Sequence, residues 1–415
     1  MTTSAPLWRN RSFNLLWSSY GLSSLGDAFS NIALPLLVLE ATGSLIQMGV
    51  VTGIIGASGL ASGLLGGPIV DRLDGRRLML ACHAISATIY GSVPIVWALG
   101  GPHVWLIYVA CAIGTFVNHV FQLANVAATT RVVGRDQLTA ANGRQQGTIA
   151  LTFVIGFLIA GIVSARFGPA IGVGVNGGLL FASAMILLLT PRGSYRGAPT
   201  EAAATSGLAE LLVGLRFLVR DPVLRWVALI SCGSNVAATA ALDLLIFRMK
   251  HDLGLPDGAV GVVFAIASVG SVAGALAASA VRRRWGFALS FLGACLLKGT
   301  SLAAIGIAPT VIAISALAVG FSFGQTIAAI NANARRQETT PARLQGRVTA
   351  AYWTVTSALA PVGVALAMII AKLTGATAVL LGMGIAASAL ALLGLLSPIR
   401  DVDTALPIEE PETQP

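Results

Sequence analysis

The sequence predicts an all-α membrane protein with twelve transmembrane helices, arranged as two six-helix halves. Hydrophobic residues make up 55% of the 415-residue chain and charged residues only 10%, whereas soluble domains carry about 25% charged residues. The mean hydropathy is +0.82. The chain contains a series of apolar runs that are each long enough to cross a bilayer, which takes roughly 20 residues. Short motifs also recur between its two halves.

Each predicted span is an apolar run bounded by charged, Gly or Pro residues. The 47 glycines suit close helix packing in lipid, where small residues let backbones approach each other. The first six spans cover 13–39, 45–70, 78–100, 103–130, 145–165 and 168–190, and the second six cover 223–249, 257–281, 286–306, 309–333, 347–371 and 375–397.

The basic residues predict the orientation. With the N-terminus in the cytoplasm, the outer side receives only Arg166, Arg248, Lys250 and Lys372, and Lys298 falls inside a span. All the other Lys and Arg residues, out of 26 in the chain, then fall on the inner side. This bias is the one that the positive-inside rule describes. We expect a multi-pass protein of the cell (inner or plasma) membrane with both termini in the cytoplasm.

The predicted organisation follows from the span positions. Residues 1–190 form the N-terminal half and residues 223–399 the C-terminal half. Residues 191–222 form the only long loop, a cytoplasmic linker that ends in leucines at helical spacing. We expect this leucine-rich part to be a short helix in the membrane interface. The acidic, Pro-rich tail 400–415 is typical of disorder.

The two halves resemble each other in sequence. RNRSF (9–13) precedes the first span, and RDPVL (220–224) precedes the seventh. VDRLDGRR follows the second span, and VRRRWGF follows the eighth. Because each half has six spans, both halves begin on the same side of the membrane. This pattern predicts two parallel halves related by an axis along the membrane normal, as in several transporter folds.

The motifs together resemble a known family. GGPIVDRLDGRR (66–77), the twelve spans and the six-plus-six repeat are similar to those of the major facilitator superfamily over nearly the whole chain. Within that family, the chain resembles the branch that holds macrolide-efflux proteins and the enterobactin exporter. The matching stretches, in chain order, are RNRSF, LGDAFSNIALPLLVL (25–39), DRLDGRR, LTAAN (138–142), RDP (220–222) and LQGRV (344–348).

The resemblance implies a gating role for the loop after the second span. Its motif residues here are Gly67, Asp71, Arg72, Arg76 and Arg77. The positive-inside rule accounts for the three arginines but not for the aspartate. In the family this aspartate contacts the other half near the start of the eleventh span, here 346–349, and helps to latch the outward-open state. The chain departs from common family patterns by having Asp74 and Phe157 where Gly and Pro are frequent.

Ionisable residues inside spans are costly and therefore mark candidate functional sites. Asp27 belongs to a polar stripe of the first span, Tyr20, Ser24, Asp27 and Asn31, which is spaced as one helix face. The functional interpretation is a proton or substrate-cation site. The alternative is a structural hydrogen bond between helices, and we favour function.

Polar stripes also occur in the fourth, seventh and tenth spans. These hold the candidates Asn118, His119 and Gln122, then Asn235 and Asp243, then Gln325. His119 is either a proton relay or a neutral hydrogen-bonding group between helices. Asp243 is either a cavity acid or the ion-pair partner of an outer gate that includes Arg248.

Two further ionisable residues lie within spans. For Lys298 we favour snorkelling or an inter-helix contact over substrate-anion binding. His83 lies one turn from the expected cytoplasmic end of the third span, and we expect it to be structural.

Several function classes are excluded or disfavoured. The four cysteines are isolated in apolar runs, which predicts no metal site, disulfide framework or cofactor. No catalytic set can be assembled, so we expect no enzyme. GxxxxGK[ST] is absent, which excludes an ATP-driven pump as a single chain. The positive charge lies in short loops beside spans, as topogenic signals do, and does not predict nucleic-acid binding.

We therefore expect a monomeric secondary transporter in the lipid bilayer that works by alternating access on a small-molecule substrate. The branch resemblance implies export of an amphipathic compound, such as a drug or a siderophore-like molecule. Proton antiport stays open, with Asp27 first and Asp243 second as the coupling acid. The alternatives are an importer or facilitator of a small metabolite, and a non-transporting receptor with the same fold.

Overall fold

The protein is described by a computed structural model, which places residues 7–134, 137–191, 207–341 and 344–403. The N-terminal half consists of α1 (Arg11–Thr42), α2 (Leu45–Arg72), α3 (Gly75–Gly100), α4 (Val104–Val132), α5 (Leu138–Phe167) and α6 (Pro169–Leu188). The C-terminal half consists of α8 (Pro222–Phe247), α9 (Asp257–Ile307), α10 (Val311–Thr339), α11 (Gln345–Ala358), α12 (Ala360–Thr374) and α13 (Ala376–Leu393). Between them lies α7 (Gly207–Arg220), and a π-helical segment, Arg248–Asp252, follows α8.

The membrane-spanning fold predicted from the sequence is confirmed. Eleven helical stretches of the described chain are long and apolar enough to cross a membrane. One of them, α9, contains two of the predicted spans. Gly286, at φ 72° and ψ −179°, interrupts its helical backbone between 257–285 and 287–307. Only glycine adopts such a conformation readily. Gly286 therefore changes the direction of the chain between the two helical segments of α9, and both segments pack on α10.

The predicted span 347–371 is interrupted in the structure. α11 ends at Ala358 and α12 begins at Ala360, with Pro361 in the first turn of α12. Proline has no N–H to donate, and its ring clashes with the carbonyl four residues earlier, which breaks a helix. The predicted span is nevertheless present as one apolar stretch, Gln345–Thr374, with a one-residue break at Leu359.

Two of the repeated motifs begin helices in the same way. The Asn10 side chain accepts a hydrogen bond from the Phe13 backbone N–H at 3.0 Å at the start of α1. The Asp221 side chain accepts from the N–H groups of Val223 and Leu224, both at 2.9 Å, at the start of α8. Asn and Asp are favoured at this position because their oxygens satisfy the free donors of the first helical turn.

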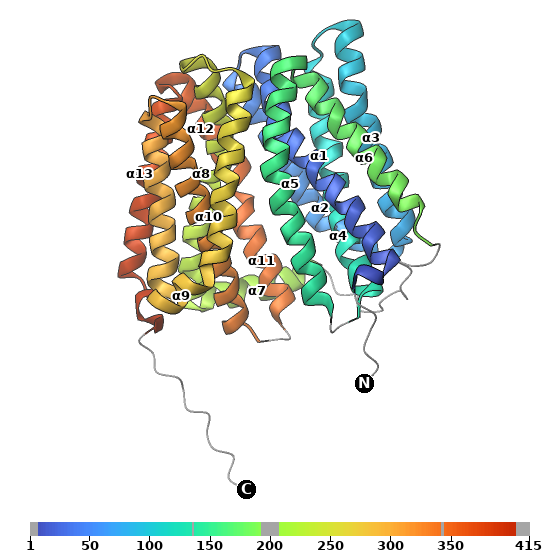
Figure 1. Ribbon diagram of the computed structural model, residues 1–415. Coiled ribbons are helices and arrows are strands. Elements are labelled where there is room, and N and C mark those ends of the chain that lie inside the picture. The colour runs from blue at the N-terminus through green and yellow to red at the C-terminus, as the bar shows by residue number, and fades with distance from the viewer. Residues whose placement is uncertain (1–6, 135–136, 192–206, 342–343, 404–415) are drawn as a thin grey trace.

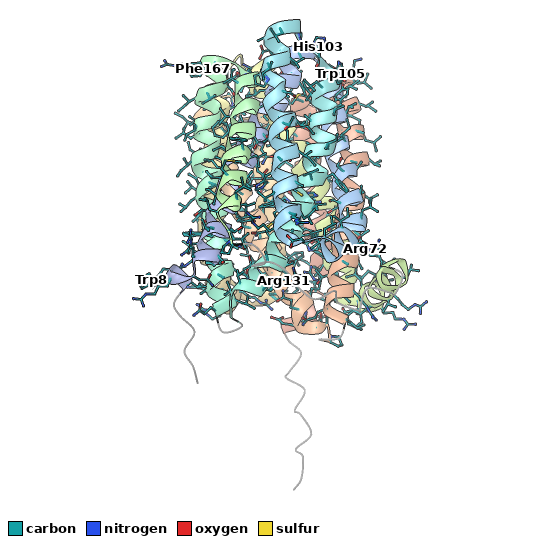
Figure 2. All side chains as sticks on the ribbon, turned by 90° about the vertical axis from the view of Figure 1, so that its right-hand side faces the viewer. Trp8, Arg72, His103, Trp105, Arg131 and Phe167 are labelled. Carbon is teal, nitrogen blue, oxygen red and sulfur yellow. The ribbon has the colours of Figure 1, made fainter. Side chains whose placement is uncertain are left out.

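The helices run between two opposite ends of the molecule. Trp8, Arg72 and Arg131 lie at one end, which we call the proximal end, and His103, Trp105 and Phe167 lie at the other, the distal end (Figure 2). α1 begins at the proximal end. Trp8 and Trp105 are 62% and 59% exposed, as expected of tryptophans in the two membrane interfaces.

Each half forms a bundle, and the bundles meet along few helices (Figure 1). In the N-terminal half, α1 and α3 pack on α6 and α2 packs on α4; in the C-terminal half, α9 packs on α10 and α13. The halves contact each other through α5 against α9 and through α2 against α12. The helix expected in the linker is present as α7. It packs on α11, where Gly214 lies against the backbone of Arg347.

Candidate functional site

A cavity of about 970 Å³ lies between the two halves. Helices from both halves line it, and its wall combines apolar and polar side chains. Seven of the eight cavity residues proposed from the sequence line this space. They are Asp27, Asn31, Asn118, His119, Gln122, Asp243 and Gln325.

Asp27 faces the cavity from the middle of α1, where it is half-buried. Its Oδ1 accepts a hydrogen bond of 2.7 Å from Nδ2 of Asn118 on α4. One turn earlier on α1, the Ser24 and Thr152 hydroxyls are 2.7 Å apart and join α1 to α5. The carboxylate is therefore positioned by a neutral amide. A salt bridge would favour the ionised form of the carboxyl group. A neutral donor positions the group and leaves both of its protonation states accessible.

Asp243 is the acid contributed by the C-terminal half. It lies on α8, is 2% exposed and lines the same cavity. Its carboxylate accepts a hydrogen bond from the hydroxyl of Thr52 on α2, so this contact joins the two halves. The suggested pairing with Arg248 does not occur. The Arg248 guanidinium instead donates to the carbonyls of Ile305, at 2.6 Å, and Ala308, at 2.8 Å.

The other polar residues of α4 form a stripe along the cavity. His119 Nδ1 lies 2.9 Å from the hydroxyl of Ser62 on α2. Gln122 Nε2 lies 3.5 Å from Oδ1 of Asn118, and the Gln122 side chain is exposed. The histidine lines the cavity and contacts a second helix, and its role as a proton relay stays a prediction.

The two halves close the cavity at the distal end. A Cβ atom at Gly161 on α5 would lie 2.6 Å from the Gly261 Cα on α9, so the two backbones touch. The rings of Phe157 and Phe264 meet beside this contact with centroids 5.9 Å apart. The residues that line the cavity continue from Phe157 toward the proximal end, as far as Gln146 on α5. The cavity therefore extends from this contact toward the proximal end.

Asn235 does not belong to this cavity. Its amide donates to the Thr356 carbonyl at 2.9 Å, near the end of α11, and it lines a smaller pocket inside the C-terminal half. Lys298 lines that pocket too and is 1% exposed. Its Nζ donates to the Ser234 carbonyl on α8 at 2.8 Å, so Lys298 makes an inter-helix contact, as favoured, and does not snorkel. His83 is buried, and its ring lies against that of Phe121 with centroids 4.0 Å apart and the ring planes tilted by 36°.

The proposed gating motif lies at the proximal end, between α2 and α3. Arg76 donates to the Thr190 hydroxyl at 3.0 Å and to the Leu188 carbonyl at 2.8 Å, at the end of α6. Asp74, which replaces the usual glycine, caps α3 by accepting from the Arg77 N–H at 3.0 Å. Gly67 and Arg72 are exposed. The side chain of Asp71 lies outside the described residues, so the latch to 346–349 stays a prediction.

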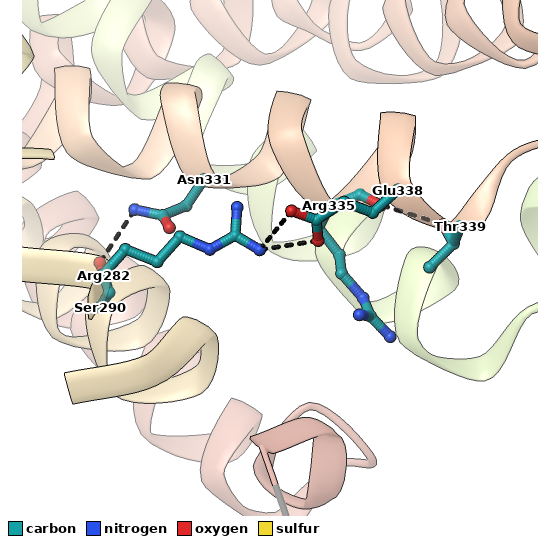
Figure 3. A network of polar contacts seen from close by, with 6 residues as sticks. All are labelled: Arg282, Ser290, Asn331, Arg335, Glu338 and Thr339. Atoms are coloured by element: carbon teal, nitrogen blue, oxygen red, sulfur yellow. Dashed lines mark hydrogen bonds and ion pairs between the residues drawn. The ribbon is translucent and has the colours of Figure 1, made fainter. Parts of the chain in front are cut away.

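The corresponding region of the C-terminal half is held by an ion pair (Figure 3). Nη2 of Arg282 lies 2.8 and 2.7 Å from the two carboxylate oxygens of Glu338 near the end of α10. Close by, Nδ2 of Asn331 donates to the Ser290 hydroxyl at 2.9 Å. Asn331 therefore joins α10 to α9 and is not among the residues that line the cavity.

Sequence reasoning missed Thr52 and the aromatic pair Phe157 and Phe264. Thr52 is a single hydroxyl in an otherwise apolar stretch of α2, a pattern too common to mark a site. Its role depends on Asp243, which is 191 positions away in the chain. The aromatic contact had one signal in the sequence. Phe157 stands where proline is frequent in the family, and it places a large side chain at the interface between the halves.

Two similar helical bundles with a cavity between them are the architecture of membrane transporters that are built from repeats. The family model of the Major Facilitator Superfamily matches residues 16–364, and the chain belongs to this family. The chain is therefore a multi-pass membrane transporter with a small-molecule substrate, and neither its family nor its named relatives are enzymes.

Curated relatives are named for efflux. The chain is 26% identical to the multidrug efflux pump Tap of Mycolicibacterium fortuitum, over 92% of this chain and 94% of that protein. It is 24% identical to the enterobactin exporter EntS of Escherichia coli, over 82% of this chain and 80% of that protein.

Solved structures share the fold. A crystal structure of the nucleoside transporter NupG superposes with a TM-score of 0.73 at 13% identity, covering 92% of this chain and 98% of that one. A bacterial homologue of the iron transporter ferroportin, in an inward-facing state, gives a TM-score of 0.69 at 14% identity, covering 94% and 99%. At this identity the likeness concerns the fold.

Proposed function

We propose that this transporter exports an amphipathic small molecule by alternating access and that export is driven by protons. The observation that carries the proposal is the cavity between the halves, which holds one acid from each half, Asp27 and Asp243. Apolar and aromatic side chains such as Phe153 and Leu242 share its wall. A wall of this kind suits a compound that has both apolar and polar parts. The two relatives named for efflux support export as the direction.

The orientation follows from the charge bias. The basic loops lie at the proximal end, which we place in the cytoplasm by the positive-inside rule. The cavity extends toward that end, and in this proposal it accepts substrate from the cytoplasm or the inner leaflet. Separation of α5 from α9 and of α2 from α12 opens the distal end and releases the substrate outside.

Protons are coupled to this movement through the two acids. An ionised carboxylate that is closed away from water is costly unless it is paired. Asp27 and Asp243 are held by Asn118 and Thr52, which are neutral. Protonation removes the cost of occluding each acid and so favours the conformers in which it is shielded. The hydrogen bond of Asp243 to Thr52 exists only while the distal end is closed, which links the state of this acid to the gate.

The test is transport into inverted membrane vesicles that contain the full chain. The substrates are a panel of fluorescent amphipathic compounds, measured with and without an acidic lumen. We expect the acidic lumen to accelerate uptake of at least one compound. Asp27→Asn should abolish the acceleration while leaving substrate exchange without a gradient intact. Asp252→Asn, which changes an acid outside the cavity, is the matched control and should transport as the wild type does.

The outcomes separate the parts of the proposal. Uptake that is indifferent to the pH gradient would rule out proton coupling. Gradient-driven uptake that persists in Asp27→Asn would remove Asp27 from the mechanism. Binding of compounds without transport of any of them would favour a receptor.

A further inference from the structure

A second pocket lies inside the C-terminal half, beside the central cavity. Its volume is about 90 Å³, and residues of α8, α9, α10 and α11 line it. Gln325 on α10 lines both this pocket and the central cavity, so its side chain forms part of the wall between them. A water molecule takes up about 30 Å³ of liquid, so the pocket has room for a small ion or for one terminal group of a larger molecule.

Lys298 supplies a positive charge to this pocket. The side chain is 1% exposed, and its Nζ donates to the Ser234 carbonyl at 2.8 Å, to the Ser234 hydroxyl at 2.6 Å and to the amide oxygen of Gln325. All three acceptors are neutral. The residues that line the pocket include no Asp or Glu, so the described wall offers the ammonium group no counter-charge.

A second buried cation lies behind the pocket wall. Arg336 on α10 is 4% exposed, and its guanidinium lies 4.6 Å from the ring centre of Tyr352, a pocket residue. Nε and Nη1 of Arg336 are buried and have no hydrogen-bond partner among the described residues. A buried cation such as Lys298, with no acid in the described pocket wall, is unfavourable by itself, because burying a charge is costly unless it is compensated.

The remaining wall offers donors and a flat surface. The hydroxyls of Ser231 and Tyr352 and the amide of Asn333 line the pocket together with the ring of Phe291. Hydroxyl and amide groups, together with an ammonium group, are the usual donors to carboxylates and to small anions.

We propose that this pocket is an anion-binding site, in which Lys298 takes a carboxylate group or an ion of similar charge and size. The anionic group enters from the central cavity by displacing the side chain of Gln325 from Nζ. Binding of an anion in this pocket does not depend on the proposed transport function. The substrate class does rest on that function, and it narrows to amphipathic compounds that carry an acidic group. A free inorganic anion offers the same chemistry, and the experiment distinguishes the two sources.

The first measurement needs no transport. The purified full-length chain is titrated with sodium acetate, benzoate or chloride against gluconate at constant ionic strength, and its thermal unfolding is followed. We expect a saturable rise in the unfolding temperature with at least one of the smaller anions. Lys298→Gln should weaken the apparent affinity about 10- to 100-fold, because a charged donor is lost. Lys298→Arg should retain the response, and Lys372→Gln, which changes an exposed lysine, is the matched control.

Tyr352→Phe provides an independent variant that keeps the size and charge of the pocket. It should reduce the affinity for the anion by removing one donor. An unfolding temperature that does not respond to any of the three anions would overturn the proposal, and so would an undiminished response in Lys298→Gln. If Lys298→Gln does not fold, an undiminished response in Tyr352→Phe together with an unchanged response in Gln325→Leu would overturn it.

The second measurement identifies the source of the anion. Uptake into inverted vesicles is compared for a fluorescent amphipathic carboxylic acid and its primary amide. A selective loss of acid uptake in Lys298→Gln supports a substrate carboxylate in the pocket. If chloride affects the uptake of both compounds equally in the wild type, and this effect is lost in Lys298→Gln, the result supports a free anion in the pocket. A wild type that transports neither compound refutes export of these compounds, while the thermal response still tests the anion site.

Discussion

A close backbone contact between the two halves gives a prediction with a calculable size. Gly161 on α5 and Gly261 on α9 touch through their backbones, and a Cβ atom at 161 would lie 2.6 Å from the Gly261 Cα and 2.9 Å from its N. Neither atom belongs to a flexible side chain, so Gly161→Ala must move one helix. Inserting a methyl group where there is no room costs about 1–3 kcal/mol. The cost arises only while the distal end is closed.

The substitution should therefore shift the equilibrium toward the distal-open conformer by about 5- to 150-fold. Spin labels on cysteines at Phe167 and Ile312 report the change, because these exposed residues flank the distal end from opposite halves. Pulsed electron paramagnetic resonance in nanodiscs should show a population at longer distance in Gly161→Ala. The native cysteines are all buried, which limits background labelling: Cys82, Cys111, Cys232 and Cys295.

Gly178→Ala is the matched control, because a Cβ at Gly178 would meet nothing within 4 Å. It should leave the distance distribution unchanged. Gly261→Ala should act as Gly161→Ala does, and combining the two should give less than the sum, since both strain one contact. A folded Gly161→Ala variant with the wild-type distance distribution would refute the assignment of this contact to the distal gate.

Three further predictions concern stability at the helix ends. Arg248→Gln should lower the unfolding temperature of the purified chain and reduce its free energy of unfolding by about 1–3 kcal/mol, because buried carbonyls at the end of α9 lose a charged donor. A melting curve like that of the wild type would contradict this. Asp74→Ala should cost about 0.5–2 kcal/mol in the same measurement, while Asp74→Ser should retain most of the stability by keeping a cap. A double-mutant cycle of Arg282→Gln and Glu338→Gln should give a coupling below about 1 kcal/mol that shrinks with salt, because both side chains are partly exposed; a larger, salt-independent coupling would show a buried pair.

Most of the fold could be predicted because its signals are local. Span positions depend on runs of apolar residues, and the linker helix was visible as leucines at helical spacing. The break at Leu359 was not predicted, although Pro361 was available as a signal. Proline is tolerated inside the continuous helices α1, α2 and α3, so its presence alone does not fix a break.

The candidate site was predictable in part. Asp27 and Asn118 were identified because polar groups inside spans are rare, and they proved to be hydrogen-bonded to each other. Asn235 was assigned to the central cavity by the same argument and lies instead in the smaller pocket. Helical periodicity places a residue on a face of its helix, but it does not say which of several neighbours that face meets.

The sequence by itself determined that the chain spans a membrane, that it has two similar halves and which of its residues are charged within the spans. These properties follow from composition and spacing along one dimension. Only the tertiary structure decided that Thr52 meets Asp243, that Arg248 completes a helix end and that Lys298 faces a pocket without an acid. The physical reason is that each of these contacts joins helices far apart in the chain, and the packing of whole helices, through backbone contacts such as Gly161 on Gly261, sets which side chains meet.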